Sequence, residues 1–271
     1  MTDHIKNIDI VKDSNDHYHS HNSISASGLK KIFNKSVHHY LETTYKESDA
    51  MRLGTAVHVA LLEREVFYDI YCPMTEKIDA RTKEGKLKKA AFEEKSEGKI
   101  VLSLQEYEVI KGINARFDKN KLAKHYCKGD KELSHYLKFE GVDVRVRPDC
   151  INYLSGFISD VKTTRLSANE EDFSSEAETR DYDLQAAFYM DMLGIDTFKF
   201  IVCEKSPPYS VMVHTLDEES IERGRQKYKI AFSDWKDYVK SGKITSFKAR
   251  KYAADGSFLI STKKWKKLRE L

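Results

Sequence analysis

The sequence lacks any apolar run long enough to cross a bilayer, and its first residues, MTDHIKNIDIVKD, lack the apolar segment of a secretory signal. Mean hydropathy is -0.60, and 33% of the residues are charged. These absences argue against a membrane protein. The sequence therefore predicts a protein of the cytoplasm, with no membrane partner.

Motifs for several cofactors are also missing. The four cysteines form no CxxC pair, which fits neither a zinc site nor an iron–sulfur cluster. No glycine-rich loop that would cradle a nucleotide phosphate is present, which disfavours a metabolic α/β enzyme. The net charge of +3 is only mildly basic, so any site for a polyanion must be a local patch.

The chain is nevertheless long and apolar enough to bury a core, with 271 residues of which 40% are hydrophobic. Its composition predicts a polar lead-in (1–22), a large domain (23–255) and a basic tail (256–271). His17, His19 and His21 alternate in the lead-in and would share one face of a strand, where they could hold a metal. A flexible polar segment is the favoured interpretation.

Three segments indicate helices in the first half of the domain. Ser25 or Ser27 could cap a helix in SISASGLKKIFNKSVHHYLE, and serines at a helix start can also hold a phosphate. In DAMRLGTAVHVALLERE, Gly54 and His58 are four residues apart and would share a helical face. Taken alone, His58 is read as a hydrogen-bonded core histidine. Residues 76–99 indicate a solvated helix or a mobile excursion.

The pattern changes to strands between residues 133 and 164. VDVRVRPDCI alternates apolar and polar residues, and its proline indicates a strand end just before Asp149. In GFISDVKTT, Asp160 and Lys162 point to the same side of an extended chain. This pair alone favours an ion pair at the rim. A meander of these strands would place Asp149 and Asp160 on neighbouring strands.

A helix is predicted in DYDLQAAFYMDML, where Gln185 and Tyr189 lie at i and i+4 on one face. The chain thus contains, in order, Gly-x-x-x-His, Pro-Asp, Asp-x-Lys and Gln-x-x-x-Tyr. This conjunction resembles the PD-(D/E)XK nucleases of the RecB-like branch, most closely the RecE-type exonuclease domain, over roughly residues 15–255. Many members of the wider superfamily have glutamate where this chain has Asp160, whereas the RecE-type pattern has aspartate.

The resemblance implies an α/β fold, with a central mixed sheet flanked by helices and a helical N-terminal part. It implies hydrolysis of a phosphodiester with Mg²⁺, for which Mn²⁺ could substitute, and no iron–sulfur cluster. The implied metal ligands are His58, Asp149, Asp160 and the carbonyl of Val161. Lys162 would lie beside the attacking water, and the helix of Gln185 and Tyr189 would line the site.

Contacts to DNA are predicted from position alone. They comprise Ser25, Ser27, Arg52, Arg145, Arg147 and Arg165. Glu132 could be a further metal ligand, but a surface position is the favoured interpretation.

The RecE-type resemblance implies a nuclease that degrades linear double-stranded DNA from its ends in the 5′→3′ direction. The 3′ single-stranded tails would serve an annealing protein in recombination or repair. It also implies a ring-shaped homo-oligomer, with a tetramer expected, and a phage or prophage origin is compatible with it. The alternatives are an endonuclease or single-strand nuclease of the same fold, and a non-catalytic module that binds DNA ends.

Overall fold

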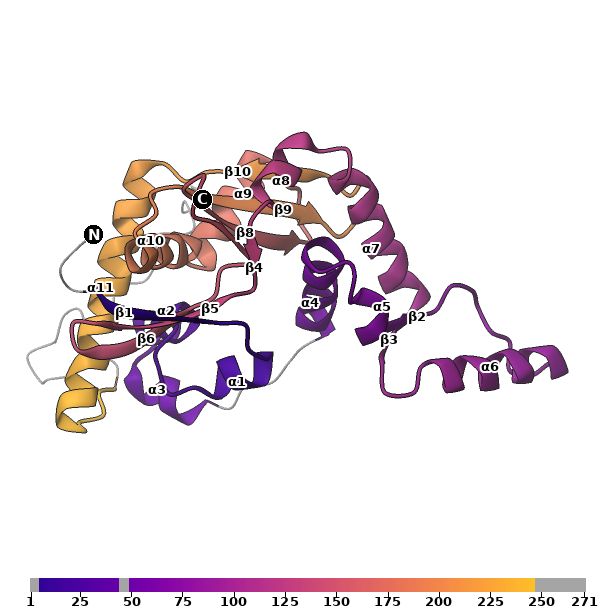
Figure 1. The fold of residues 1–271 in the computed structure, drawn as a ribbon, viewed down its shortest axis with the longest axis horizontal. Coiled ribbons are helices and arrows are strands. Elements are labelled where there is room, and N and C mark those ends of the chain that lie inside the picture. Colours follow the sequence, from indigo (N-terminus) through magenta and orange to yellow (C-terminus); the bar gives the residue numbers. More distant parts are fainter. Residues whose placement is uncertain (1–4, 44–48, 247–271) are drawn as a thin grey trace, which may run out of the picture.

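The structure, a computed structural model, describes residues 5–43 and 49–246 (Figure 1). The predicted basic tail, 256–271, lies outside the described residues. Within the described part of the chain, no helix is long and apolar enough to span a membrane.

A five-stranded mixed sheet forms the centre of the molecule, in the order β10-β9-β8-β7-β4 (Figure 1). β8 and β9 run parallel, and the other neighbours in this sheet are antiparallel. The strands are β4 (Asp130–Lys131), β7 (Cys150–Asn152), β8 (Phe157–Thr164), β9 (Phe198–Glu204) and β10 (Val211–His214). This arrangement confirms the predicted α/β class and the predicted adjacency of the strands near Asp149 and Asp160.

Helices cover both faces of this sheet. The first half of the chain supplies α1 (Asn15–Ser20), α2 (Ala26–Asn34), α3 (Val37–Glu42), α4 (Asp49–Leu62), α5 (Phe67–Ile70), α6 (Lys83–Lys95), α7 (Leu104–Phe117) and α8 (Lys121–Tyr126). The second half supplies α9 (Glu170–Thr179), α10 (Tyr182–Leu193) and α11 (Glu218–Ser241). α4, α7 and α8 pack on one face, and α9, α10 and α11 pack on the other together with α2.

Each face of β8 joins a different hydrophobic core. Ile158 packs with the core formed by α2, α10 and α11, whereas Val161 packs with the core formed by α4 and α7. Successive side chains of a strand point to opposite faces, so this central strand is covered by helices on both sides. Because both faces are covered, the polar side chains of β8 are removed from water. Their burial is costly unless they are hydrogen-bonded, paired or bound to an ion.

The N-terminal segment belongs to the fold. β1 (Ile5–Val11) pairs with β5 (Ser134–Phe139), which in turn pairs with β6 (Val142–Val146), and the three form a separate antiparallel sheet. His17 lies in α1, and its Nδ1 is 2.8 Å from Asp13 Oδ2. The interpretation of residues 5–20 as a flexible lead-in is therefore wrong, and so is the strand in which His17, His19 and His21 would share a face.

The charged segment 76–99 forms a peripheral excursion. It contains α6, which projects away from the rest of the molecule beyond the small parallel sheet of β2 (Tyr71–Pro73) and β3 (Ile100–Leu102) (Figure 1). Most of its side chains are exposed, as its dense lysine and glutamate content predicts. It contributes nothing to the site described below.

Candidate active site

The site is built on an edge of β8 that loses its strand neighbour. β7 pairs with β8 only as far as Ser159. Beyond that point the Val161 N–H donates to Asp149 Oδ2 at 2.6 Å, so a carboxylate replaces a strand. Pro148 precedes Asp149 outside the strand, as predicted from its missing N–H. The acid is thereby held against the middle of β8.

Tyr189 holds the backbone segment that leads into Asp149. Its ring is buried, and its hydroxyl donates to the carbonyl oxygen of Arg147 at 3.2 Å. This bond holds the chain two residues before Asp149. The predicted place of Tyr189 beside the site thus corresponds to a contact that positions the backbone.

A potential metal centre lies at this edge. His58 from α4, Glu132 after β4 and Asp149 before β7 each offer a ligand atom, and these atoms lie within 4.8 Å of one another. His58 Nδ1 is 3.3 Å from Asp149 Oδ2. The Glu132 N–H donates to the Asp149 carbonyl at 3.3 Å, which ties the two acidic segments together.

Asp160 and Lys162 project from β8 next to this centre. Lys162 Nζ is 2.5 Å from Asp160 Oδ1, and the same oxygen accepts a hydrogen bond of 2.7 Å from Gln185 Nε2. Both β8 side chains are largely buried, so the ion pair is not the solvent-exposed rim pair that the motif alone favours. The structure thus brings Asp149, from Pro-Asp, and the Asp-x-Lys pair together with Gln185 of α10.

The electrostatics of the cluster favour an added cation. Burial, and then the charges of Asp160 and Glu132, raise the pKa of Asp149 well above its usual range. Burial, and then repulsion from other acids, raises the pKa of Glu132 to about 7 despite the charge of Arg147. Burial lowers the pKa of His58 to about 4. A neutral imidazole and crowded carboxylates are the donors that a divalent cation would stabilise.

Asp160 differs from Asp149 because its carboxylate is paired with a lysine. Burial opposes ionisation of Asp160, but the Lys162 ammonium outweighs it and lowers the pKa of Asp160 below the usual value. Burial likewise opposes the charged form of Lys162, yet the carboxylates, Asp160 foremost, raise its pKa. At neutral pH this pair is therefore ionised, and one charged carboxylate is preformed at the site.

The comparisons with known proteins agree with this geometry. Residues 25–247 match the family described as PDDEXK-like domain of unknown function (DUF3799). The chain belongs to this PDDEXK-like family. The predicted membership of the PD-(D/E)XK nucleases is thus confirmed, and no curated protein matches the chain significantly.

One solved structure with a TM-score above 0.5 shares the fold of this PDDEXK-like chain. A candidate exonuclease of Eubacterium rectale shares 15% identity with a TM-score of 0.59, covering 87% of this chain and 90% of its own. A phage-related exonuclease of Haemophilus somnus 129PT shares 12% identity over 83% of this chain and 99% of its own, with a TM-score of 0.35. At this identity the first likeness supports the fold alone.

Two arginines that the sequence predicts to contact DNA bind other residues of the PDDEXK-like chain instead. Arg145 donates from its guanidinium to the carbonyls of His21 and Ser23, and Arg147 pairs with Asp13 and donates to Ser134 Oγ at 2.8 Å. Both arginines are buried. The structure therefore does not present them to DNA.

The remaining predicted contacts have mixed surroundings. Arg52 pairs with Glu106, and Ser25 Oγ accepts from the Gly28 N–H at 3.3 Å as the cap of α2. Ser27 and Arg165 are exposed. Of the predicted set, these two are the residues that the structure leaves most accessible to a ligand.

The sequence favours a surface position for Glu132, whereas the structure turns this residue toward His58 and Asp149. Its residue is only partly exposed, and its carboxylate joins His58 and Asp149. The backbone of Glu132 has a φ of 52°, a conformation that L side chains rarely adopt. No motif in the sequence marks this position, because the turn that aims it depends on the pairing of β4 with β7.

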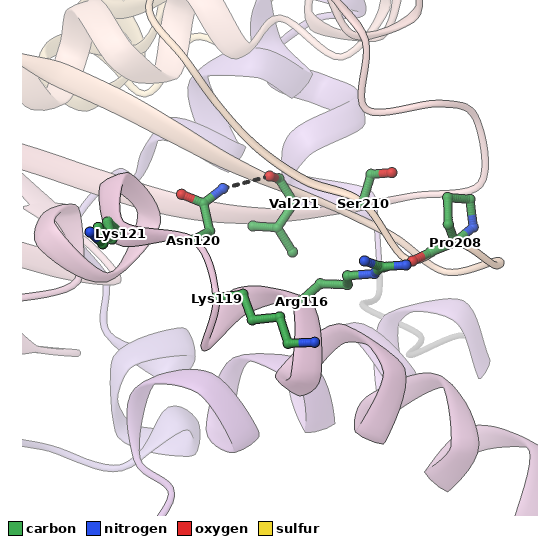
Figure 2. A pocket seen from close by; sticks show the side chains of 7 residues that line it. All are labelled: Arg116, Lys119, Asn120, Lys121, Pro208, Ser210 and Val211. Atoms are coloured by element: carbon green, nitrogen blue, oxygen red, sulfur yellow. Dashed lines mark hydrogen bonds between the residues drawn. The ribbon is translucent and has the colours of Figure 1, made fainter.

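A hollow elsewhere on the surface is not part of this site. It measures about 530 Å³ and lies between α7, α8 and the turn from β9 to β10 (Figure 2). Arg116 donates to the carbonyl of Pro208 at 2.9 Å, and Asn120 donates to that of Val211 at 2.7 Å. Its lining includes no carboxylate and none of the clustered residues, so the chemistry is assigned to the edge of β8.

The variant Glu132→Gln tests the candidate metal centre through stability and metal affinity, with no measurement of enzyme activity. Because the native state raises the pKa of Glu132, stability is lost as pH rises from about 4.5 to about 7. We expect metal-free Glu132→Gln to be more stable than wild type by about 1–3 kcal/mol at pH 8, with no gain near pH 4. Its affinity for Mn²⁺ should fall at least about 10-fold. Thermal melts and calorimetric titration measure both, with exposed Glu65→Gln as the control.

Equal Mn²⁺ affinity in Glu132→Gln and wild type would exclude Glu132 as a ligand. A stability difference that does not change with pH would contradict the raised pKa of this carboxyl.

Proposed function

We propose that this protein is a metal-dependent exodeoxyribonuclease that degrades linear double-stranded DNA from its ends. The observation that carries the proposal is the convergence of Asp149, Asp160 and Lys162 at the open edge of β8, with His58 beside them. The RecE-type resemblance supports 5′→3′ degradation that leaves 3′ tails for an annealing protein. It also supports a ring-shaped homo-oligomer, with a tetramer expected.

The donor set fits a hard divalent cation, and Mg²⁺ is proposed, with Mn²⁺ as a substitute that tolerates imidazole. Asp149, Asp160, His58 and the carbonyl of Val161 would hold it, together with Glu132. When bound, such a cation supplies a Lewis acid that activates water and neutralises charge on the phosphate.

Lys162 acts in its protonated form. Because the pKa of Lys162 is raised, its ammonium keeps its proton at neutral pH and cannot accept one from water. It can instead donate hydrogen bonds to the attacking water and to the oxygens of the scissile phosphate. Asp160 holds this ammonium at 2.5 Å, and Gln185 fixes the carboxylate by its own hydrogen bond. Gln185 is thus a positioning residue.

A basic surface next to the site is proposed to bind the DNA backbone. A hollow of about 700 Å³ begins at Thr163, directly after Lys162, and includes Arg165, Arg180 and Lys205. Arg180 pairs with Glu176 at 2.7 Å. Among the described residues, no ion pair or side-chain hydrogen bond engages Arg165 or Lys205. Arg165 lies three residues, or about 10 Å, along the chain from Lys162, which suits contact with a neighbouring phosphate.

Arg165→Ala should weaken DNA binding with little effect on the chemical step. We expect the KM for a linear duplex to rise about 3- to 10-fold, with kcat within about 2-fold of wild type, and the salt dependence of binding to decrease by about one charge. Steady-state kinetics and binding titrations at several salt concentrations measure these changes. Arg81→Ala, at an arginine 90% exposed on the distant excursion, is the matched control. If both variants behave alike, the basic hollow does not bind DNA.

Digestion of closed and linear DNA tests the proposed mode of action. A linear duplex labelled at either the 5′ or the 3′ end is incubated with Mg²⁺ alongside a covalently closed circle. We expect loss of the linear duplex alone, with the 5′ label released first. Cleavage of the circle would indicate an endonuclease. A shift of DNA ends in a gel without any cleavage, in Mg²⁺ or Mn²⁺, would indicate a binding module.

A further inference from the structure

A second lysine, which no motif marks, reaches the site from α2. Lys30 Nζ is 3.1 Å from Gln185 Oε1 and 4.9 Å from the centre of the Tyr182 ring. Lys162 Nζ is 3.4 Å from the same amide oxygen and 4.6 Å from the same ring. Two ammonium groups, carried by different elements, therefore share one amide oxygen and one aromatic ring.

Lys162 has a carboxylate in direct contact, whereas Lys30 contacts an amide oxygen instead. Asp160 lies in contact with Lys162 at 2.5 Å, whereas no carboxylate in the described part of the chain lies within 4.0 Å of Lys30 Nζ. Asp181 and Asp183, at the start of α10, are paired with Lys227 at 2.8 and 2.9 Å. Gln185 and the ring of Tyr182 supply only partial negative charge.

Holding two ammonium groups together in a partly buried space is unfavourable. Burial, and then the charge of Lys162, lowers the pKa of Lys30 to about 7, whereas Asp160, Asp181 and Asp183 act in the opposite sense. A cation placed here contributes to stability only when an anion joins it. In this site the expected anion is the substrate, because the scissile phosphate must lie next to Lys162.

We propose that Lys30 is a second catalytic lysine, which together with Lys162 binds the nonbridging oxygens of the scissile phosphate. The inference rests on the proposed function. During hydrolysis the water oxygen bonds to phosphorus while its proton passes to solvent. The bond from phosphorus to the leaving oxygen breaks, its electron pair stays on that oxygen, and the oxygen takes a proton from solvent. The negative charge of the bound phosphate raises the pKa of Lys30, so that Lys30 is protonated and donates hydrogen bonds to the phosphoryl oxygens, where negative charge is concentrated.

Lys30→Met tests the role, because methionine keeps the length and removes the charge. We expect kcat for a linear duplex in Mg²⁺ to fall about 10- to 100-fold, with KM changed less than about 3-fold. Metal-free Lys30→Met should melt at or above the wild-type temperature, because an unpaired buried cation is lost. Lys31→Met, the adjacent lysine of the same helix, is the matched control and should retain wild-type kcat.

A phosphorothioate substrate separates contact from positioning. Sulfur replaces one nonbridging oxygen at the scissile phosphate, in each stereoisomer separately. If Lys30 contacts that oxygen, one isomer slows wild type but causes a smaller further loss in Lys30→Met, because the interaction is already absent. If the two losses multiply for both isomers, Lys30 acts only through Gln185 and the proposed contact is wrong.

The outcomes distinguish this inference from the function on which it rests. If wild type releases no nucleotide with any divalent cation, the proposed function fails and the role of Lys30 fails with it. If wild type is active and Lys30→Met keeps a kcat within about 2-fold of it, the inference alone is overturned.

Discussion

Asp160→Asn is expected to reduce DNA hydrolysis at least about 10³-fold while leaving the fold intact. Asp160 is buried in the centre of β8, and its carboxylate is held ionised by Lys162 and Gln185. Asparagine keeps the shape but removes the charge that would neutralise both a bound cation and the lysine. The amide also places an N–H group where Lys162 needs an acceptor.

Three measurements are needed for Asp160→Asn. Nucleotide release from a linear duplex gives the loss of activity, a thermal melt verifies folding, and calorimetry gives Mn²⁺ affinity, which should fall together with activity. Asp143→Asn is the matched control, because Asp143 pairs with Lys138 at 2.6 Å at the exposed position of β6, in the other sheet. Asp160→Asn activity within about 10-fold of wild type would place the reaction elsewhere.

Lys162→Met is expected to lower kcat about 10²- to 10³-fold while metal binding is retained. The variant loses the ammonium that donates to the water and the phosphate but keeps every carboxylate of the cluster. In metal-free buffer it should melt below wild type, because Asp160 is left as a buried charge with Gln185 alone. Added Mn²⁺ should restore most of this stability, since the cation replaces the missing positive charge.

The control for Lys162→Met is Lys138→Met, which breaks the exposed pair with Asp143 and should change neither activity nor stability by much. Single-turnover hydrolysis at saturating metal isolates the chemical step, and calorimetry verifies that Mn²⁺ still binds. An unchanged kcat in Lys162→Met would show that the ion pair with Asp160 is merely structural.

The structure brings together the central residues that the sequence assigns to the candidate site, because they lie close together along the chain or at fixed helical spacing. Asp160 and Lys162 share a face by the geometry of any strand, and the short meander places Asp149 on the neighbouring strand. Gln185 is within reach of β8 because α10 packs against that face. These relations depend on local geometry, which one sequence contains.

The failures all involve contacts between distant segments. Arg145 and Arg147 alternate with valines in a pattern that indicates a solvated face, but the segment around α1 and Ile24 covers that face. The sequence contains no signal that β1 pairs with β5 or that α1 packs beside it, so it predicts a flexible lead-in instead. Glu132 and Lys30 reach the site through the β4–β7 pairing and through the packing of α2 on α10. Only the assembled fold brings them there.

The most direct test of the central claim is nucleotide release from a linear duplex by metal-free protein as Mg²⁺ is added. We predict no release in the presence of a chelator, saturable release with Mg²⁺, and no release by Asp160→Asn at any concentration. Release that persists in the chelator, or that is equal in Asp160→Asn and wild type, would contradict a cation-dependent reaction at the edge of β8.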